Sequence, residues 1–158
     1  MSRSVRSFLP LDVDPDAAVA AFRGDPQVWL PDARHIGPER YVIDVGPAAW
    51  TRPVTVTLGG PWQVGRTWWR TCCWEPTIPD GDTTVSRLLP RLDAELGLAL
   101  RPAGRATLVL DGRYDPPGGR FGDAIDAVAL TRVASATVER LLREITQRLR
   151  AAPVAVRS

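Results

Sequence analysis

Two stretches of alternating apolar and polar residues, separated by a short turn, constrain the fold of this chain more than any other feature. The first covers residues 92–100, the second covers residues 106–114, and residues 102–104 lie between them. A period of two puts alternate side chains on opposite faces of a β-strand, so both stretches predict strands with one buried face. The turn, which contains proline and glycine, predicts that they form an antiparallel hairpin. The apolar set is Leu92, Ala94, Leu96, Leu98, Leu100, Ala106, Leu108, Leu110 and Tyr114.

A long segment with helical periodicity follows, from about residue 121 to residue 150. In its second half the apolar residues recur at helical spacing, and most charged residues fall elsewhere. This pattern predicts one amphipathic helix that covers the apolar face of the sheet. Pro153 ends the helix, so residues 153–158 are expected to form a frayed tail. The apolar stripe consists of Val138, Leu141, Leu142, Ile145 and Leu149.

The first part of the chain predicts further strands and two short helices. Residues 4–11 alternate as a first strand, and the pairs Asp14-Pro15 and Asp25-Pro26 each supply an N-cap and a first helical residue. Alternation returns at residues 41–46 and 54–58 and in the run 65–76, whereas a loop is expected around His35. The sequence therefore predicts an α+β fold. It comprises an antiparallel sheet of about six strands, two short helices after the first strand and a long C-terminal helix, in one domain over residues 1–152.

Composition excludes several functional classes. The net charge is +2, from 20 basic and 18 acidic residues, so no broad electrostatic surface for nucleic acid is expected. No segment approaches the ~18 apolar residues that cross a bilayer, and the N-terminus lacks the apolar core of a signal peptide. We therefore expect a cytoplasmic protein without membrane insertion. Every basic residue is arginine, which excludes a lysine Schiff base.

The chain resembles the START-like superfamily, which includes polyketide cyclase/dehydrase and lipid-transport-like proteins. The resemblance rests on the element order, on DPDAAVAAFRGDPQVWLP at residues 14–31 and on LDGRYDPPGGRFGDAIDAVALTRVASATVERLLREI at residues 110–145. The last segment and the WEP at residues 74–76 are similar to an uncharacterised bacterial branch. The resemblance implies a helix-grip fold, with a curved sheet around the C-terminal helix and a cavity between them for hydrophobic ligands. The superfamily shares no catalytic motif, so no catalytic residue is carried over.

The run GRTWWRTCCWEP, residues 65–76, concentrates three tryptophans and both cysteines of the chain. On a strand, Trp68, Arg70, Cys72 and Trp74 share one face, and the residues between them share the other. We favour the first face as the concave one, because two indole rings there gain most from burial. The tryptophans are interpreted as core, cavity wall or interface residues.

The cysteines predict no redox or metal centre. Cys72 and Cys73 are adjacent on a strand and point in opposite directions, which disfavours a disulfide between them. Together with His35, the only histidine, they fall short of the four ligands of a structural zinc site. We interpret them as small apolar residues and expect no metal and no cofactor.

The leading functional hypothesis is binding of a small apolar or amphipathic molecule between the sheet and the C-terminal helix. Aromatic side chains would shape the pocket, and Arg70 would bind a polar end of the ligand. No catalytic residue is predicted. The candidate ligand-binding residues are Trp68, Arg70, Trp74 and Tyr114, with Phe121 and Trp29 near the mouth.

Two alternatives remain open from the sequence. One is an aromatase/cyclase-like enzyme acting on a polyketide-type substrate, in which Arg70, Tyr114 or His35 would steer proton transfer. The other is a non-catalytic interaction module, in particular a homodimer with Trp50 or Trp62 at the interface.

Overall fold

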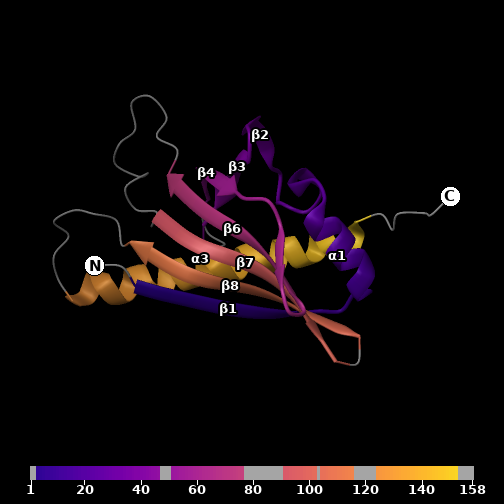
Figure 1. The fold of residues 1–158 in the computed structure, drawn as a ribbon. Coiled ribbons are helices and arrows are strands. Elements are labelled where there is room, and N and C mark those ends of the chain that lie inside the picture. The colour runs from indigo at the N-terminus through magenta and orange to yellow at the C-terminus, as the bar shows by residue number, and fades with distance from the viewer. Residues whose placement is uncertain (1–2, 47–50, 77–90, 103, 116–123, 153–158) are drawn as a thin grey trace.

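The structure is a computed structural model that describes residues 3–46, 51–76, 91–102, 104–115 and 124–152. A curved antiparallel sheet forms one layer, and a long C-terminal helix, α3 (Ala124–Ala151), lies along its inner face (Figure 1). A short helix, α1 (Pro15–Arg23), and a 3-10 turn, η1 (Pro26–Val28), follow the first strand. The predicted α+β helix-grip architecture is therefore confirmed.

The sheet has the strand order β1-β8-β7-β6-β4-β3-β2, and β5 pairs with β6 beside this path. All of its pairings are antiparallel. The strands are β1 (Arg3–Leu11), β2 (Arg34–Gly37), β3 (Arg40–Val45), β4 (Arg52–Leu58), β5 (Trp62–Val64), β6 (Thr67–Pro76), β7 (Arg91–Arg101) and β8 (Arg105–Asp115).

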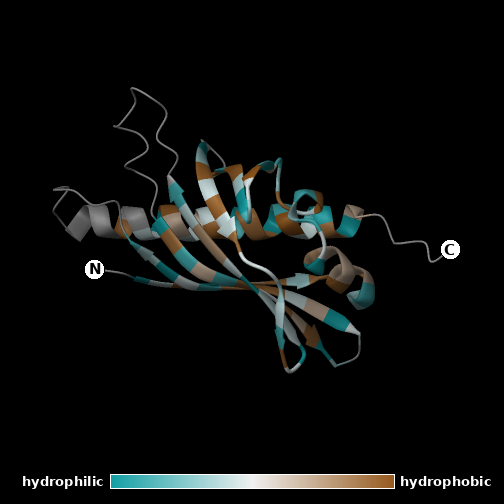
Figure 2. Ribbon diagram, turned by 45° about the horizontal axis from the view of Figure 1, so that its top comes forward, coloured by the Kyte–Doolittle hydropathy of each residue, from teal (hydrophilic) through white to brown (hydrophobic). Residues whose placement is uncertain are grey.

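The predicted hairpin forms the centre of the sheet. Strands β7 and β8 pair in continuous register from Arg91 with Asp115 to Arg101 with Arg105. Their even-numbered residues face α3, and hydrophobic and hydrophilic bands alternate along the long strands (Figure 2). The apolar stripe of α3 packs against this face: Val138, Leu141, Leu142, Ile145 and Leu149 are each at most 3% exposed. One core therefore lies between the sheet and the helix.

Helix α1 begins and ends where the sequence indicates. The side chain of Asp14 accepts a hydrogen bond from the amide of Ala17 at 3.1 Å, and Pro15 occupies the first turn. Gly24 caps the C-terminal end, and Phe22 is fully buried. The helix therefore places Phe22 in the core, and η1 follows it.

Three local expectations differ from the structure. The second helix is only the 3-10 turn η1, and the sheet has two more strands than expected, β2 and β5. Strand β2 is a short edge strand in which Arg34, His35 and Ile36 are all exposed, so it lacks the alternation that marks a half-buried strand. Strand β5 is three residues long and pairs only with β6, which leaves no periodic signal to read.

Candidate functional site

The inner face of the sheet carries a row of large side chains in direct register across five strands. Tyr41, Val56, Trp74, Leu92 and Tyr114 occupy paired positions on β3, β4, β6, β7 and β8. Each is at most 7% exposed. The face of β6 that carries Trp74 is therefore the inner one, as favoured from the sequence.

Tyr114 links the sheet to α3 by a hydrogen bond. Its hydroxyl lies 3.1 Å from Oγ1 of Thr131, and Arg3 of β1 donates to the same oxygen at 2.9 Å. Tyr114 is only 3% exposed, and a buried hydroxyl needs a hydrogen-bond partner, which Thr131 supplies. The side chains of Thr131 and Arg3 were not predicted; they lie far apart in the sequence, and only the fold brings them together.

Arg70 is 5% exposed and donates four hydrogen bonds to main-chain carbonyls. Nε bonds to Phe22 at 2.9 Å, Nη2 bonds to Arg23 at 3.1 Å and Gly24 at 3.0 Å, and Nη1 bonds to Gly59 at 2.9 Å. Three of these carbonyls lie at the C-terminal end of α1, where the helix dipole is negative. Burial lowers the pKa of Arg70, but an arginine remains charged at neutral pH. The geometry fastens α1 to the sheet and leaves few donors for the ligand contact expected from the sequence.

Trp29 is fully buried rather than at a mouth. Its ring stacks on Phe22 at a centroid distance of 5.3 Å, and the guanidinium carbon of Arg70 lies 5.9 Å from the ring centre. Within the described part of the chain, the indole Nε1 has no hydrogen-bond acceptor. A buried donor of this kind calls for an explanation.

Trp68 lies at the margin of the inner face and is half-buried. The guanidinium carbon of Arg23 lies 4.2 Å above the centre of its ring, a close cation–π contact. Phe121, the remaining candidate, lies outside the described residues. The structure therefore brings Trp29, Trp68 and Arg70 together around the end of α1, and it places Trp74 and Tyr114 in the row beneath α3.

Tyr41 was not among the candidates, although it lies beside this cluster. Burial, the largest cause, and the nearby Asp25 raise its pKa, so its hydroxyl remains protonated. The ring of His35 lies 5.1 Å from that of Tyr41, but His35 itself is exposed on the edge strand β2. The alternation through residues 41–46 predicted a strand with one buried face; nothing in the sequence placed Tyr41 near Arg70.

The described interior is closed at its centre. Leu96, Leu98, Leu108 and Ile145 are 0% exposed, so no water-sized void reaches these side chains. Along the edge between β3 and α3 lies a cavity of about 10 Å³, close to the space of one water molecule. A ligand between sheet and helix must therefore displace side chains or move an element.

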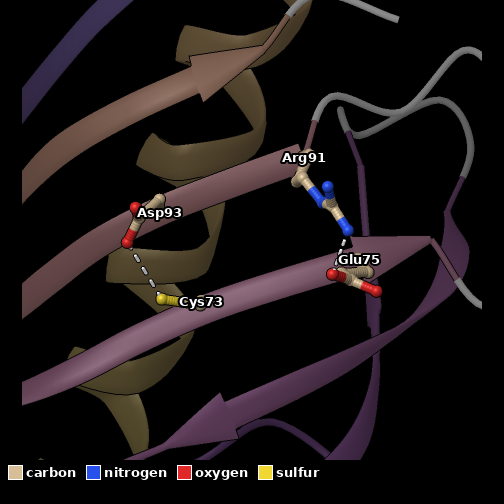
Figure 3. Close-up of polar contacts among 4 residues, drawn as sticks. All are labelled: Cys73, Glu75, Arg91 and Asp93. Atoms are coloured by element: carbon tan, nitrogen blue, oxygen red, sulfur yellow. Dashed lines mark hydrogen bonds and ion pairs between the residues drawn. The ribbon is translucent and has the colours of Figure 1, made fainter.

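The outer face of β6, β7 and β8 carries a polar hollow of about 500 Å³. Figure 3 shows the thiol of Cys73 donating to Asp93 at 3.1 Å and Arg91 paired with Glu75. Arg113, also on the lining, adds a further positive charge. Charges of both signs alternate across the strands and neutralise one another, which is typical of a solvated sheet face. Across the described residues, no group of histidine, cysteine and acidic side chains could hold a metal ion.

The two thiols should react more slowly than ordinary cysteines. Burial raises the pKa of Cys72 to about 12, and burial together with the hydrogen bond to Asp93 raises that of Cys73. Since the thiolate is the nucleophile, at pH 8 we expect slow modification of Cys73 by an aromatic disulfide reagent and none of Cys72. The rate for Cys73 should keep rising above pH 9, and Asp93→Asn should increase it at pH 8. Rapid titration of both thiols at pH 7 without denaturant would contradict this assignment.

Comparison with known proteins identifies the fold. No family model matches the sequence, and no curated protein matches it either. A protein of unknown function from Staphylococcus aureus superposes with a TM-score of 0.55 at 11% identity, over 96% of this chain and 95% of that chain. The Zhui aromatase/cyclase from Streptomyces sp. R1128 superposes with a TM-score of 0.52 at 14% identity, over 96% and 93%. A START superfamily protein from Mycobacterium smegmatis gives 0.52 at 9% identity, over 95% and 99%.

The chain therefore has the fold of START-like and aromatase/cyclase structures along nearly its whole length, in agreement with the resemblance read from its sequence. At these identities the likeness establishes the fold alone. Among the residues that the structure describes, no helix is both long and apolar enough to cross a bilayer.

Proposed function

We propose that this chain binds one small apolar or amphipathic molecule between the inner face of its sheet and α3. The observation that carries the proposal is the indole nitrogen of Trp29, a buried donor without an acceptor among the described residues. Such a group costs about 1–3 kcal/mol, and native proteins usually satisfy it with water or a ligand. A ligand oxygen at this nitrogen would remove the cost.

The surroundings of Trp29 support the same proposal. Phe22, Trp68 and Tyr41 bring further aromatic rings to this end of the inner face, and aromatic side chains with a few polar groups are the usual lining of ligand pockets. The superposed aromatase/cyclase, by its name, acts on a molecule that cyclises, and a similar molecule would suit this lining. We propose a cytoplasmic location on the grounds given by the sequence.

Binding must be coupled to opening, because the centre of the interior is filled. The segment from α1 to η1 covers the Trp29 end, and the hydrogen bonds of Arg70 hold it there. A ligand would bind a minor open state, so its apparent affinity would be reduced by the fraction of that state. Slow association, with a rate that reaches a plateau at high ligand concentration, is the expected signature.

An aromatase/cyclase-like activity receives less support from the described side chains. Four N–H groups of Arg70 already bind carbonyls, and the hydroxyl of Tyr114 binds Thr131. His35 is exposed on an edge strand. Binding is therefore the function we put forward.

The test uses tryptophans on opposite faces of β6. Palmitate, cholesterol and an aromatic polyketide are titrated while tryptophan emission and the melting temperature are recorded. One class should alter the emission and, at 100 times its Kd, stabilise the fold by about 2.7 kcal/mol, a rise of several degrees. Trp74→Phe, on the inner face, should reduce the emission change to the part that comes from Trp29, whereas the matched control Trp69→Phe, on the outer face, should retain all of it.

Two results would count against the proposal. One is the absence of any melting shift with all three classes at saturating concentration. The other is an emission change that disappears in Trp69→Phe and persists in Trp74→Phe, because that result would place the compound on the outer face.

A further inference from the structure

An apolar row crosses the outer face of the sheet, on the side away from α3. Trp62, Trp69, Gly97, Val109 and Phe8 are in direct register on β5, β6, β7, β8 and β1. The ring of Trp69 lies over Gly97, where an added Cβ would stand 2.6 Å from the ring. Phe8 is 53% exposed and both tryptophans are half-buried. Such a row on the solvent side of a sheet is unusual, because that face is normally polar.

A second row lies beside the first, towards the hairpin ends, and it is made of smaller residues. Val64, Thr67, Ala99, Thr107 and Pro10 are again in register across the same five strands. Val64 is 63% exposed. We call these ten residues of the two rows the outer patch. All of them lie within the described residues; β6, β7, β8 and β1 run side by side in Figure 1, and β5 pairs with β6.

The outer patch has an acidic border and a basic border. Glu95 lies two residues before Gly97, and Arg101 lies two residues after Ala99. The two charged residues are thus equally far, three residues each, from the centre of the outer patch at Leu98. Both are exposed, and neither forms an ion pair with another described residue.

Strand β8 repeats this arrangement. Asp111 pairs with Glu95 in the register, and Arg105 pairs with Arg101. Asp111 is bound to Arg6 of β1, whereas Arg105 is exposed and has no ion pair with another described residue. Glu95, Arg101 and Arg105 are therefore available to pair with charges of a second molecule.

We propose that the outer patch is the interface with a second copy of this chain. The two copies would be related by a two-fold axis that runs across the strands at the level of Leu98. This rotation places Glu95 against the partner's Arg101, and Arg101 against the partner's Glu95. It also places the row of large rings against the row of small residues in the partner. A two-fold axis along the strands would instead oppose Glu95 to the partner's Glu95, so the charges select the first arrangement.

The size of the outer patch suits a weak dimer. Five strands about 4.8 Å apart and seven residues at about 3.4 Å each cover a square of roughly 24 Å per side. Because the sheet curves around α3, its outer face is convex, and two such faces bury at most about 1,000 Å², the lower end for specific interfaces. The dimer is expected to dissociate on dilution within the micromolar range. It is independent of the proposed ligand binding, which uses the opposite face.

Sedimentation equilibrium of the full chain, from about 1 to 500 µM, tests the proposal. Glu95→Arg and Arg101→Glu should each weaken dimerisation at least tenfold, because each creates two repulsive contacts by symmetry. The double variant Glu95→Arg/Arg101→Glu should restore the Kd to within about threefold of the original, since both contacts become attractive again. Glu139→Arg, an exposed charge reversal on α3, is the matched control and should leave the Kd unchanged.

Circular dichroism and melting of every variant separate folding from association. A protein that stays monomeric to 500 µM would overturn the proposal, as would a dimer that ignores both single reversals or that the double variant fails to restore. Monomeric protein that sediments with phosphatidylserine vesicles, and loses this binding in Arg101→Glu, would assign the outer patch to a lipid surface and would also overturn it.

Discussion

Replacing Arg70 by methionine is expected to lower the free energy of unfolding by about 3–4 kcal/mol. Methionine keeps the apolar stem but leaves the carbonyls of Phe22, Arg23, Gly24 and Gly59 without their donor. Removing one desolvated charge offsets part of this cost, so the expected loss of stability is not larger. For a domain of this size, the melting temperature should fall by about 10 °C. Chemical denaturation and thermal melting both measure the effect.

Two further variants make this result specific. Arg70→Lys keeps the charge and restores some of the hydrogen bonds, so it should lose about half as much stability. Arg66→Met, in the exposed turn before β6, should change stability by no more than about 0.5 kcal/mol. Amide exchange of residues 22–24 should accelerate in Arg70→Met more than exchange in β7 does. Equal stability of Arg70→Met and the original protein would show that the four hydrogen bonds do not fasten α1.

Gly112→Ala is expected to cost about 3 kcal/mol or more, although it adds a single methyl group. A Cβ at Gly112 would lie 2.3 Å from Cβ of Ala94 and 2.4 Å from the carbonyl oxygen of Asp93. The oxygen belongs to the neighbouring strand β7, so relief requires β7 and β8 to separate where they pair. The variant should melt much lower than the original protein, or fail to accumulate as folded protein.

The control for Gly112 is Gly60→Ala, since an added Cβ at Gly60 meets no atom within 4 Å. Its stability should stay within about 0.5 kcal/mol of the original. If Gly112→Ala and Gly60→Ala are equally stable, the close approach of β7 and β8 at this position does not occur.

The sequence predicted the parts of the fold that have strong periodicity. The alternation through residues 92–100 and 106–114 predicted the hairpin of β7 and β8, and the apolar stripe from Val138 to Leu149 predicted α3. Strand β2 was not predicted, because an exposed edge strand needs no apolar alternation. Strand β5 was not predicted, because three residues are too few to show a period. Hydrophobic periodicity therefore failed to predict strands in which no face is fully buried.

The site was predictable only in part. The alternation in the tryptophan run separated Trp74 from Trp69, and the structure places them on opposite faces of the sheet. The role of Arg70 was not readable, because it depends on carbonyls 46–48 residues earlier in the chain. The complete burial of Trp29 was likewise not predictable, because its neighbours Phe22 and Arg70 come from α1 and β6. Phe121, Trp50, the tail at residues 153–158 and the single-domain boundary at residue 152 remain predictions.

The proposed ligand enters the interior between the sheet and α3 and reaches Trp29. The most direct measurement is a titration followed by the indole ¹⁵N–¹H signals of the six tryptophans, assigned with single Trp→Phe variants. The compound with the largest melting shift should move the signals of Trp29 and Trp74 and leave those of Trp62 and Trp69 in place. Unmoved signals of Trp29 and Trp74 with palmitate, cholesterol and the aromatic polyketide, all at saturation, would contradict it.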